Sequence, residues 1–410
     1  MVYVQNAEGK PLMPTIRYGK VRRLLKKGLA KVVQREPFTI RLNYETTEFT
    51  QFVSLGVDAG SVHIGVSATT DVKELYAAEI QLRTDIVDLI AARRAARSAR
   101  RCRKTRYRMP RFKNRRRKEG WFAPSVENRI QTHLRVIDNV CTILPIVSIT
   151  IEVAQFDIQS IKKTDISGVE YWYGEQFGFW NIREYVLSRD NHTCQHCKGK
   201  SGDKILNVHH IESRTTGGNS PGNLTTLCKT CHKLYHQGKI KLSIDREYSF
   251  RNESAMETMR WELSRRAKLK YPNVHLTYGY KTKNMRIFYK LEKSHAIDAR
   301  CISNNPNAIP LNEFFFMKQI RRHNRQIHKM NKIRKGVRKN NQAAFEVNGF
   351  RLFDKVLCEG KKCFIYARRS SGYFDVRLLD GERIRASVSY KKLKLIQRCR
   401  SLLVEKRIRS

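Results

Sequence analysis

The chain has 410 residues, and its 81 Lys and Arg against 37 Asp and Glu give a formal net charge of +44 at pH 7. Such a surplus repels itself in a compact protein unless a polyanion neutralises it, and nucleic acid is the polyanion that gains affinity by counterion release. A hydrophobic content of 40% is enough for packed cores and excludes wholesale disorder. A membrane-surface binder is disfavoured because no amphipathic anchor accompanies the charge.

The sequence also carries signals about compartment. No stretch reaches about 18 uninterrupted apolar residues, the length of a membrane-spanning helix. The N-terminal MVYVQNAEGKPLMP lacks the apolar core of a signal peptide. Four of the ten cysteines form two CxxC pairs and six are scattered, which is typical of a reducing compartment with a metal site. We therefore expect a cytoplasmic protein with no membrane partner.

The first third of the chain predicts a basic module followed by a mixed domain. Residues 1–50 contain a short helix from Gly19 to Lys27 and then strands of alternating pattern. From Phe52 a buried strand, a glycine-containing turn and a second strand follow, and residues 75–82 make a third. This order indicates a β-meander that opens a mixed α/β domain.

Residues 93–118 then change character, because 15 of these 26 residues are Lys or Arg and none is acidic. No helix breaker stands before Pro110, so a helix is predicted at least to Tyr107. A helix that is basic all round has no apolar face to bury. It must lie against a polyanion or stay solvated.

The rest of the chain alternates helices and strands. Residues 126–144 have helical spacing, and residues 146–155 form a buried strand that carries Glu152. Residues 256–271 are helical, residues 284–292 are strand-like, and a helix opens at residues 295–303.

A second basic segment and a β-rich tail end the chain. Residues 318–339 contain ten Lys and Arg and predict a basic helix. Residues 345–400 alternate strand-like runs with turns, which predicts a small β-barrel or sheet.

The two CxxC pairs predict a structural zinc site. Thirty residues separate the pairs, and each CxxC places two sulfurs on one tight turn, so that two turns complete a tetrahedron. Because sulfur fills all four positions, this zinc has no open coordination site and is not catalytic. Its ligands are Cys194, Cys197, Cys228 and Cys231.

The residues around these cysteines, VHHIESRTTGGNSPGNLTTLC and CHKLYH, resemble the HNH (ββα-metal) nuclease family. The resemblance implies that His210 is the general base, that His209 is a metal ligand where many relatives have Asp, and that Asn223 braces the hairpin. His232 and His236, on one helical face, would complete a site for one Mg²⁺ or another divalent cation. A neutral imidazole is a suitable base at neutral pH. The alternative is a bare zinc ribbon that binds nucleic acid without cutting.

Three acids lie far apart in sequence but in similar local settings: Asp58 and Glu152 end buried strands, and Asp298 begins a helix. Singly, each is typical of a helix cap or a solvated carboxylate. Together they resemble the RuvC/RNase H fold, in which two strands and a C-terminal helix bring carboxylates to two Mg²⁺ ions about 4 Å apart. His295, three residues before Asp298, would act as a base or orient the scissile phosphate. Carboxylates crowded in this way require a divalent cation.

The order of these features resembles the IscB family of transposon-encoded RNA-guided nucleases, which are similar to ancestors of the CRISPR type II effectors. An acidic strand, an arginine-rich helix, a second acidic strand, an HNH insertion and an HxxD helix follow one another. The N-terminal segment contains the literal PLMP at Pro11 to Pro14, and GFRLFDKVLCEGKKCFIYARRSSGYFDVR resembles the family's terminal domain. The chain departs from relatives at Ala59, where they often have Pro, and at His209.

The resemblance implies an α/β multidomain fold: a split RNase H-like (RuvC) mixed sheet with an inserted ββα-metal HNH domain, a basic bridge helix and a small β-rich C-terminal domain. The expected segments are 1–51 for the PLMP module, 52–90, 120–175 and 251–310 for the three RuvC parts, 91–119 for the bridge helix, 176–250 for the HNH domain with its zinc, 311–344 for a basic helical RNA-binding linker, and 345–410 for the domain that contacts the target-adjacent motif and RNA.

The resemblance also implies a function. The protein would be an RNA-guided endonuclease of double-stranded DNA, with HNH cutting the guide-paired strand and RuvC the displaced strand. Its cofactors would be two Mg²⁺ in RuvC, one Mg²⁺ in HNH, one structural Zn²⁺ and a noncoding ω-type guide RNA, in a ribonucleoprotein with one protein chain in the prokaryotic cytosol. The arginines expected to contact nucleic acid are Arg93, Arg94, Arg97, Arg100, Arg101, Arg103, Arg106, Arg108, Arg321 and Arg322.

Three other functions compete with this interpretation. An unguided HNH or homing-type DNA endonuclease would leave the interrupted acidic triad and the PLMP module unexplained. A non-catalytic transposon-associated regulator that binds RNA or DNA is disfavoured, because decayed sites usually lose a catalytic residue. An RNase H-type enzyme that cuts RNA hybrids would be active without its HNH domain.

Overall fold

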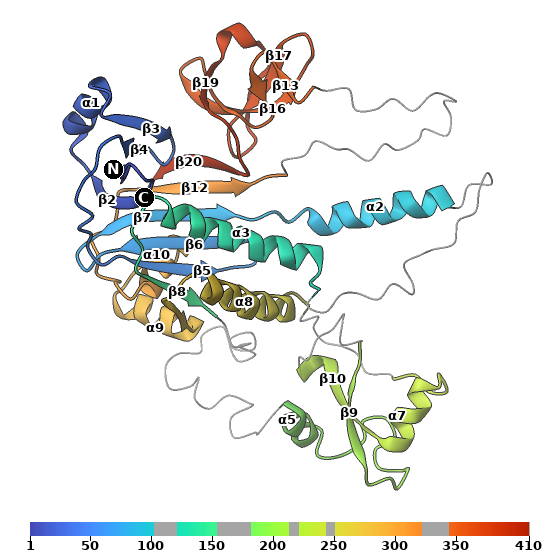
Figure 1. Ribbon diagram of the computed structural model, residues 1–410. Coiled ribbons are helices and arrows are strands. Elements are labelled where there is room, and N and C mark those ends of the chain that lie inside the picture. The colour runs from blue at the N-terminus through green and yellow to red at the C-terminus, as the bar shows by residue number, and fades with distance from the viewer. Residues whose placement is uncertain (102–120, 154–181, 213–220, 243–250, 322–343, 410) are drawn as a thin grey trace, which may run out of the picture. The chain divides into compact units, whose positions relative to one another are not determined.

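The computed structural model describes residues 1–101, 121–153, 182–212, 221–242, 251–321 and 344–409 (Figure 1). The chain divides into two compact units. Unit 1 comprises residues 1–151, 271–275 and 291–410, and unit 2 comprises residues 152–270 and 276–290. The chain therefore leaves unit 1 and returns to it. Both units combine helices and strands, as the predicted mixed α/β fold requires.

Unit 1 begins with a four-stranded sheet in the order β2-β1-β4-β3. Its elements are β1 (Val2–Gln5), β2 (Pro11–Thr15), α1 (Tyr18–Lys26), β3 (Ala30–Gln34) and β4 (Thr39–Leu42). Val21 of α1 packs with Val2 and Ile40 in a small core. The helix predicted from Gly19 to Lys27 is confirmed and begins one residue earlier.

A seven-stranded sheet in the order β11-β8-β5-β6-β7-β12-β20 follows among the described residues. Its strands are β5 (Ser54–Ala59), β6 (His63–Thr69), β7 (Glu74–Gln81), β8 (Ser148–Glu152), β11 (Val274–Thr277), β12 (Glu313–Gln319) and β20 (Leu402–Ile408). β5, β6 and β7 pair antiparallel, which confirms the predicted β-meander. β8 pairs parallel with β5, and β12 pairs parallel with β7.

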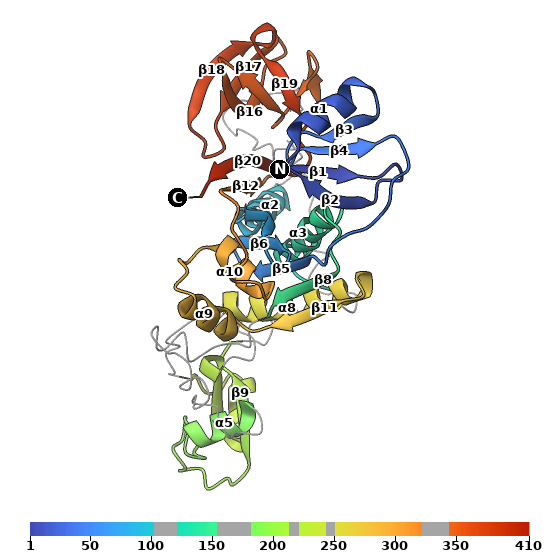
Figure 2. The same cartoon turned by 90° about the vertical axis from the view of Figure 1, so that its left-hand side faces the viewer.

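Helices α3 (Pro124–Cys141) and α10 (His295–Ile302) cover opposite faces of this sheet (Figure 2). α3 has a proline in its first turn and buries Ile130, Ile137 and Val140. α10 lies unusually close to the strands, because a Cβ at Gly56 would lie 1.9 Å from the Ala299 carbonyl oxygen. The missing side chain is what lets this helix approach the sheet.

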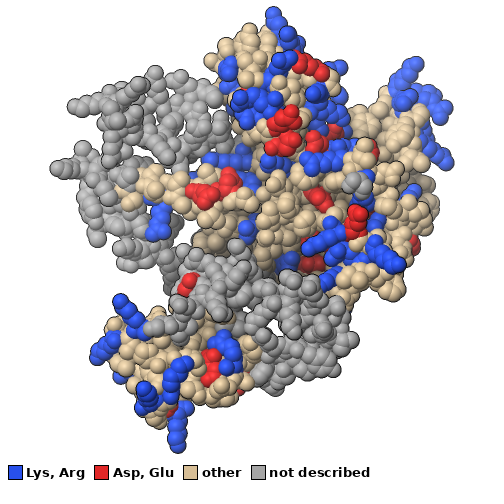
Figure 3. Space-filling view, turned by 180° about the vertical axis from the view of Figure 1, so that it is seen from behind, with Lys and Arg blue, Asp and Glu red and all other residues tan. Residues whose placement is uncertain are grey.

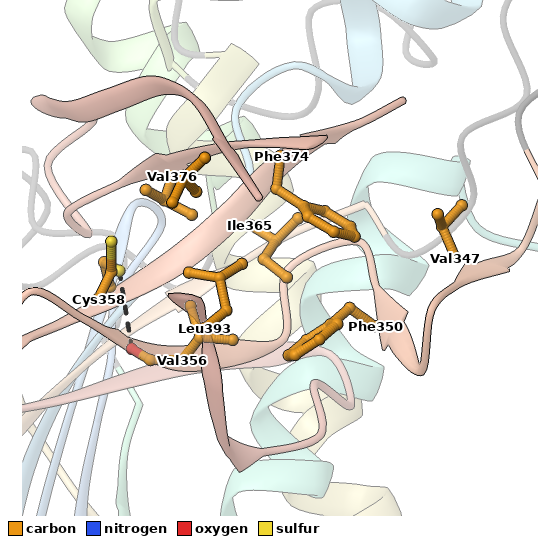
Figure 4. Close-up of a cluster of buried hydrophobic side chains, with 10 residues drawn as sticks. Val347, Phe350, Val356, Cys358, Ile365, Phe374, Val376 and Leu393 are labelled. Carbon is orange, nitrogen blue, oxygen red and sulfur yellow. Dashed lines mark hydrogen bonds between the residues drawn. The ribbon is translucent and has the colours of Figure 1, made fainter. Parts of the chain in front are cut away.

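The C-terminal part of unit 1 is a five-stranded sheet in the order β18-β17-β16-β15-β19, with the two-stranded β13-β14 beside it. Its strands are β13 (Glu346–Val347), β14 (Phe350–Arg351), β15 (Lys355–Cys358), β16 (Lys361–Arg368), β17 (Tyr373–Arg377), β18 (Arg383–Ser389) and β19 (Lys394–Gln397). Phe350 and Phe374 meet edge to face at 5.5 Å in its core (Figure 4). The β-rich tail predicted at residues 345–400 is confirmed.

Two sequence predictions differ from the structure in unit 1. Residues 311–344 were expected to form a basic helical linker, but Glu313–Gln319 is strand β12, and residues 322–343 lie outside the described part of the chain. The apolar run FFFM (Phe314–Met317) pairs with β7 and β20, and this pairing outweighs the helical sequence pattern of the residues that follow. Residues 345–410 were expected to be one domain, yet β20 leaves it and joins the central sheet.

Unit 2 contains a small two-stranded sheet and several helices. Its elements are α5 (Ile182–Arg189), β9 (Leu206–His210), the 3-10 turn η2 (Pro221–Asn223), β10 (Leu224–Cys228), α7 (Lys229–His236), α8 (Arg251–Lys270) and α9 (Gly279–Phe288). The prediction of a strand at residues 284–292 is wrong, because most of that segment belongs to α9 and to the turn after it. No described helix is both long and apolar enough to cross a bilayer.

Candidate functional site

The four predicted cysteines meet in unit 2. Their Sγ atoms lie within 4.8 Å of one another, and all four thiols are free of disulfides. Cys197 and Cys228 have their sulfurs 3.9 Å apart. A tetrahedral zinc with bonds of about 2.3 Å needs sulfur pairs about 3.8 Å apart, so the observed separation fits zinc.

Local structure fixes this cluster. Cys228 ends β10 and caps α7, where its sulfur accepts a hydrogen bond from the Cys231 backbone N–H at 3.4 Å. The hydrogen bond with the Ser201 side chain lowers the pKa of the Cys197 thiol to about 6, whereas burial raises the pKa of Cys231. Bound zinc would stabilise both as thiolates, and nearby Leu227 closes the cluster with apolar contacts.

A second cluster is made of three imidazoles on β9 and α7. His209, His232 and His236 each offer a ring nitrogen, and these nitrogens lie within 4.8 Å of one another. The Nε2 atoms of His232 and His236 are 3.3 Å apart, as expected for residues four apart on one helix. The structure therefore brings together the three predicted metal-binding histidines of the HNH motif.

The burial, hydrogen bonding and pKa of His209 are those of a metal-binding histidine. It is buried, and its Nε2 makes no hydrogen bond within the described residues. Burial, followed by the neighbouring histidines, lowers the pKa of His209 to about 4. The ring is therefore neutral at pH 7 and can present a lone pair to a metal, so the residues fit a divalent cation.

The two other predicted HNH residues lie beside this cluster. His210 ends β9, is half-buried, and is close enough to contribute to the low pKa of His209. Asn223 is fully buried: its side chain accepts from the Glu212 N–H at 2.9 Å and donates to the Glu212 carbonyl at 3.0 Å. Asn223 thus holds the backbone that follows His210.

In unit 1, two of the predicted RuvC residues contact each other directly. His295 Nδ1 lies 2.7 Å from Asp58 Oδ2. Asp58 is buried on β5, and its hydrogen bond raises the pKa of His295. Asp298 is in the first turn of the same helix, α10, so the helix carries both predicted residues to the strand that bears Asp58.

Two residues of this site were not predicted from the sequence. Glu79 on β7 accepts a hydrogen bond from the Ala296 N–H at 3.1 Å, which satisfies a backbone donor at the start of α10. His63 opens β6, and its ring centroid lies 5.2 Å from that of His295. A signal for Glu79 was available, since an acid interrupts the otherwise apolar core of LYAAEIQL.

Glu152 ends β8 and belongs to unit 2. Its Oε2 accepts a hydrogen bond from the Thr282 hydroxyl at 2.9 Å, and Arg260 lies 3.8 Å from its Oε1. The parallel register of β5 and β8 pairs Val57 with Ile151. Asp58 follows Val57 on β5 and Glu152 follows Ile151 on β8, so each acid comes directly after one residue of this pair.

The arginines expected to contact nucleic acid fall on two basic segments. Arg93, Arg94 and Arg97 are exposed on α2 (Ile86–Arg101), and Lys and Arg outnumber acidic residues on the face in Figure 3. Arg100 and Arg101 also belong to α2, and Arg321 is half-buried after β12. Four others lie outside the described residues, namely Arg103, Arg106, Arg108 and Arg322. The predicted continuation of the helix to Tyr107 lies there as well.

Comparison with protein families gives two matches. Residues 2–174 match the RRXRR protein family, and residues 194–238 match the HNH endonuclease family. The second match spans both CxxC pairs and all three clustered histidines.

Two curated proteins resemble part of this chain. A "Probable HNH endonuclease" of Lactococcus phage SK1 is 35% identical over 79 residues, which cover 17% of this chain and 82% of that protein. "Anaredoxin" of Nostoc sp. strain PCC 7120 is 31% identical over 65 residues, which cover 16% of this chain and 83% of that protein.

Two solved structures of Streptococcus thermophilus Cas9, in complex with the GGAA PAM and the AGGA PAM, are also similar. They share 13% and 14% sequence identity with this chain and cover 52% and 51% of it. This chain spans 30% of each Cas9 chain, at a TM-score of 0.25.

Proposed function

Because the chain belongs to the HNH endonuclease family, we propose that it is an RNA-guided DNA endonuclease of the IscB type, with two separate cutting centres. Nuclease activity follows from the family. The guide, the duplex substrate and the division of the two strands between the centres belong to the proposal. The observation that carries it is the coexistence, in one chain, of the three-histidine cluster and the separate Asp58–His295 pair.

The HNH centre would cut the strand paired to the guide. His209, His232 and His236 would hold one Mg²⁺ or a similar cation, which supplies charge stabilisation at the scissile phosphate. His210 would take the proton from the attacking water. Asn223 keeps that base in position through its two hydrogen bonds to Glu212. The four cysteines would hold a zinc that is structural.

The RuvC-type centre would cut the displaced strand. Asp58, Glu152 and Asp298 would hold two Mg²⁺ ions, which supply water activation and leaving-group stabilisation. The register of β5 and β8 supports this grouping, since Asp58 and Glu152 follow a directly paired couple of residues. His295, whose pKa is raised by Asp58, can carry a proton at the scissile phosphate.

Guide RNA is proposed as the partner that neutralises the charge. The net charge of +44 needs a polyanion, and α2 presents three exposed arginines. In guided effectors, base pairing reads the sequence while the protein contacts the backbone. We place the ribonucleoprotein, with a single protein chain, in the prokaryotic cytosol.

The deciding experiment begins with the RNA that co-purifies with the protein. A discrete structured RNA with a variable end is expected, and its variable end defines the duplex to test with each strand labelled separately. His210→Ala should then leave only the displaced strand cut, and Asp58→Ala only the guide-paired strand. Heterogeneous or absent RNA, together with cutting of any duplex in Mg²⁺, would support the unguided endonuclease instead. Loss of both cuts in either variant would contradict two independent centres.

A further inference from the structure

Helix α9 begins beside Glu152. The Thr282 hydroxyl donates to Glu152 Oε2 at 2.9 Å, and a Cβ on Gly279 would lie 3.4 Å from Glu152 Oε1. Thr282 is buried, so this side of the helix faces the carboxylate. The proposed RuvC-type centre uses Glu152 but gives no role to α9.

The opposite side of α9 is open to solvent and carries large apolar side chains. Phe288 is 78% exposed and Ile287 is 54% exposed. Tyr280 and Lys281 are exposed seven residues earlier, and residues seven apart return to the same helical face. A helix normally buries such a face, so this one indicates a binding surface.

The charge of this segment identifies the kind of partner. Residues 276–290 contain four Lys and Arg, four aromatic residues and no acid. The rings of Tyr278 and Tyr280 are stacked at 6.1 Å with an interplanar angle of 10°, and Lys281 Nζ lies 6.0 Å from the Tyr278 ring centroid, so cation and rings are interleaved. Basic side chains interleaved with aromatic rings are what single-stranded nucleic acid binds, with its phosphates on the cations and its bases on the rings. An apolar protein partner would not need the four cations.

We propose that the exposed face of α9, comprising Tyr280, Lys281, Ile287 and Phe288, is a stacking platform for single-stranded DNA next to Glu152. The proposal rests on the RuvC-type function, because the displaced strand is the single strand that such a centre would cut. A helical rise of 1.5 Å per residue sets Phe288 about 9 Å along the axis from Thr282.

The test compares Phe288→Ala, Phe288→Leu and Phe288→Trp in the full-length protein. Leucine keeps the apolar surface but cannot stack on a base, whereas tryptophan keeps stacking. Phe49, 90% exposed in another part of the chain, provides the matched control Phe49→Ala. The first measurement is binding of a fluorescent oligothymidine of about 12 nucleotides in about 0.5 M salt, which suppresses general electrostatic binding. The second is the ratio of displaced-strand to guide-paired-strand cutting on one labelled duplex.

Phe288→Ala and Phe288→Leu should bind the oligothymidine about tenfold more weakly and lower the cutting ratio, while Phe288→Trp and Phe49→Ala behave like the wild type. Wild-type behaviour of Phe288→Leu would overturn stacking and favour an apolar protein partner or a second copy of the chain. An equal loss of both cuts, or no loss, would also overturn it. If the protein shows no guided cutting but its oligothymidine binding still depends on Phe288, the proposed function is wrong and the stacking platform is supported.

Discussion

The substitution Gly65→Ala tests how the sheet positions the proposed RuvC-type centre. Gly65 lies on β6, paired directly with Asp58 on one side and with Glu79 on the other. A Cβ at this position would lie 1.9 Å from the carbonyl oxygen of His295. One methyl group would therefore push the start of α10 away from the strand that carries Asp58.

The size of the effect follows from the geometry. Real Cβ contacts do not fall below 3.0 Å, so the His295 backbone or β6 must move by at least 1.1 Å, the difference between 3.0 and 1.9 Å. Overpacking of this kind costs about 1–3 kcal/mol of stability. A misplacement of about 1 Å at a reacting group lowers a rate by about 100-fold. We expect cutting of the displaced strand to fall by that factor and cutting of the guide-paired strand to stay unchanged.

The assay measures both cuts on one duplex with differently labelled strands, together with the thermal unfolding of the variant. Gly19→Ala is the matched control, because nothing lies within 4 Å of a Cβ at Gly19, which belongs to helix α1. Alanine there should leave both cuts intact and stabilise α1 slightly. If Gly65→Ala cuts the displaced strand at the wild-type rate, the close approach of α10 does not position His295 and the reasoning is wrong.

Three further predictions concern zinc, acid stability and a buried ion pair. Cys228→Ser should lower the zinc content from one per chain and unfold the HNH region, as measured by metal analysis and proteolysis; unchanged zinc would refute the four-thiolate site. Hydrogen bonds from Arg265, and then Arg266, lower the pKa of Glu262 to about 2. The ionised carboxylate therefore stabilises the fold above about pH 4.5, and this stabilisation is lost as the pH falls towards 2. The acid unfolding curve of Glu262→Gln should lack this component. Glu36→Ala should cost about 3–5 kcal/mol of unfolding free energy, because it leaves the buried Lys355 ammonium without its carboxylate. Lys362→Ala breaks only the exposed ion pair to Glu36 and should cost less than about 1 kcal/mol.

The elements that the sequence predicted correctly are those with a strong local pattern. The β-meander from Phe52 and the helix before Pro145 follow from periodicity within a short window. The ββα arrangement around the cysteines was predicted from the resemblance to HNH nucleases. The same resemblance grouped the three histidines: two are four residues apart on one helix, and His209 lies on β9, the first strand of the hairpin.

The elements that the sequence did not predict depend on distant partners. β12 is a strand because β20, more than 80 residues later, pairs with it along its whole length. The segment MRIFYKL has the aromatic and β-branched residues of a strand, yet the part up to Phe288 is helical in α9, whose Thr282 is bound to Glu152, 130 residues earlier. Glu79 and His63 were missed for the same reason, because their role depends on α10 reaching strands more than 200 residues before it.

The two centres differ in what holds them together. The Asp58–His295 pair rests on a seven-stranded sheet, where Leu55, Val57 and Ile64 are fully buried and the glycines let α10 lie against the strands. The histidine cluster rests on two short strands and one eight-residue helix, which bury too little apolar surface to fold by themselves. His232 directly follows Cys231 on α7, and His236 lies one turn further along the same helix, so zinc bound by the cysteines would fix the position of both imidazoles. Zinc bound by the four cysteines would therefore stabilise the histidine cluster as the sheet core stabilises the Asp58–His295 pair, which would explain why thiolates and imidazoles occur together in one short segment.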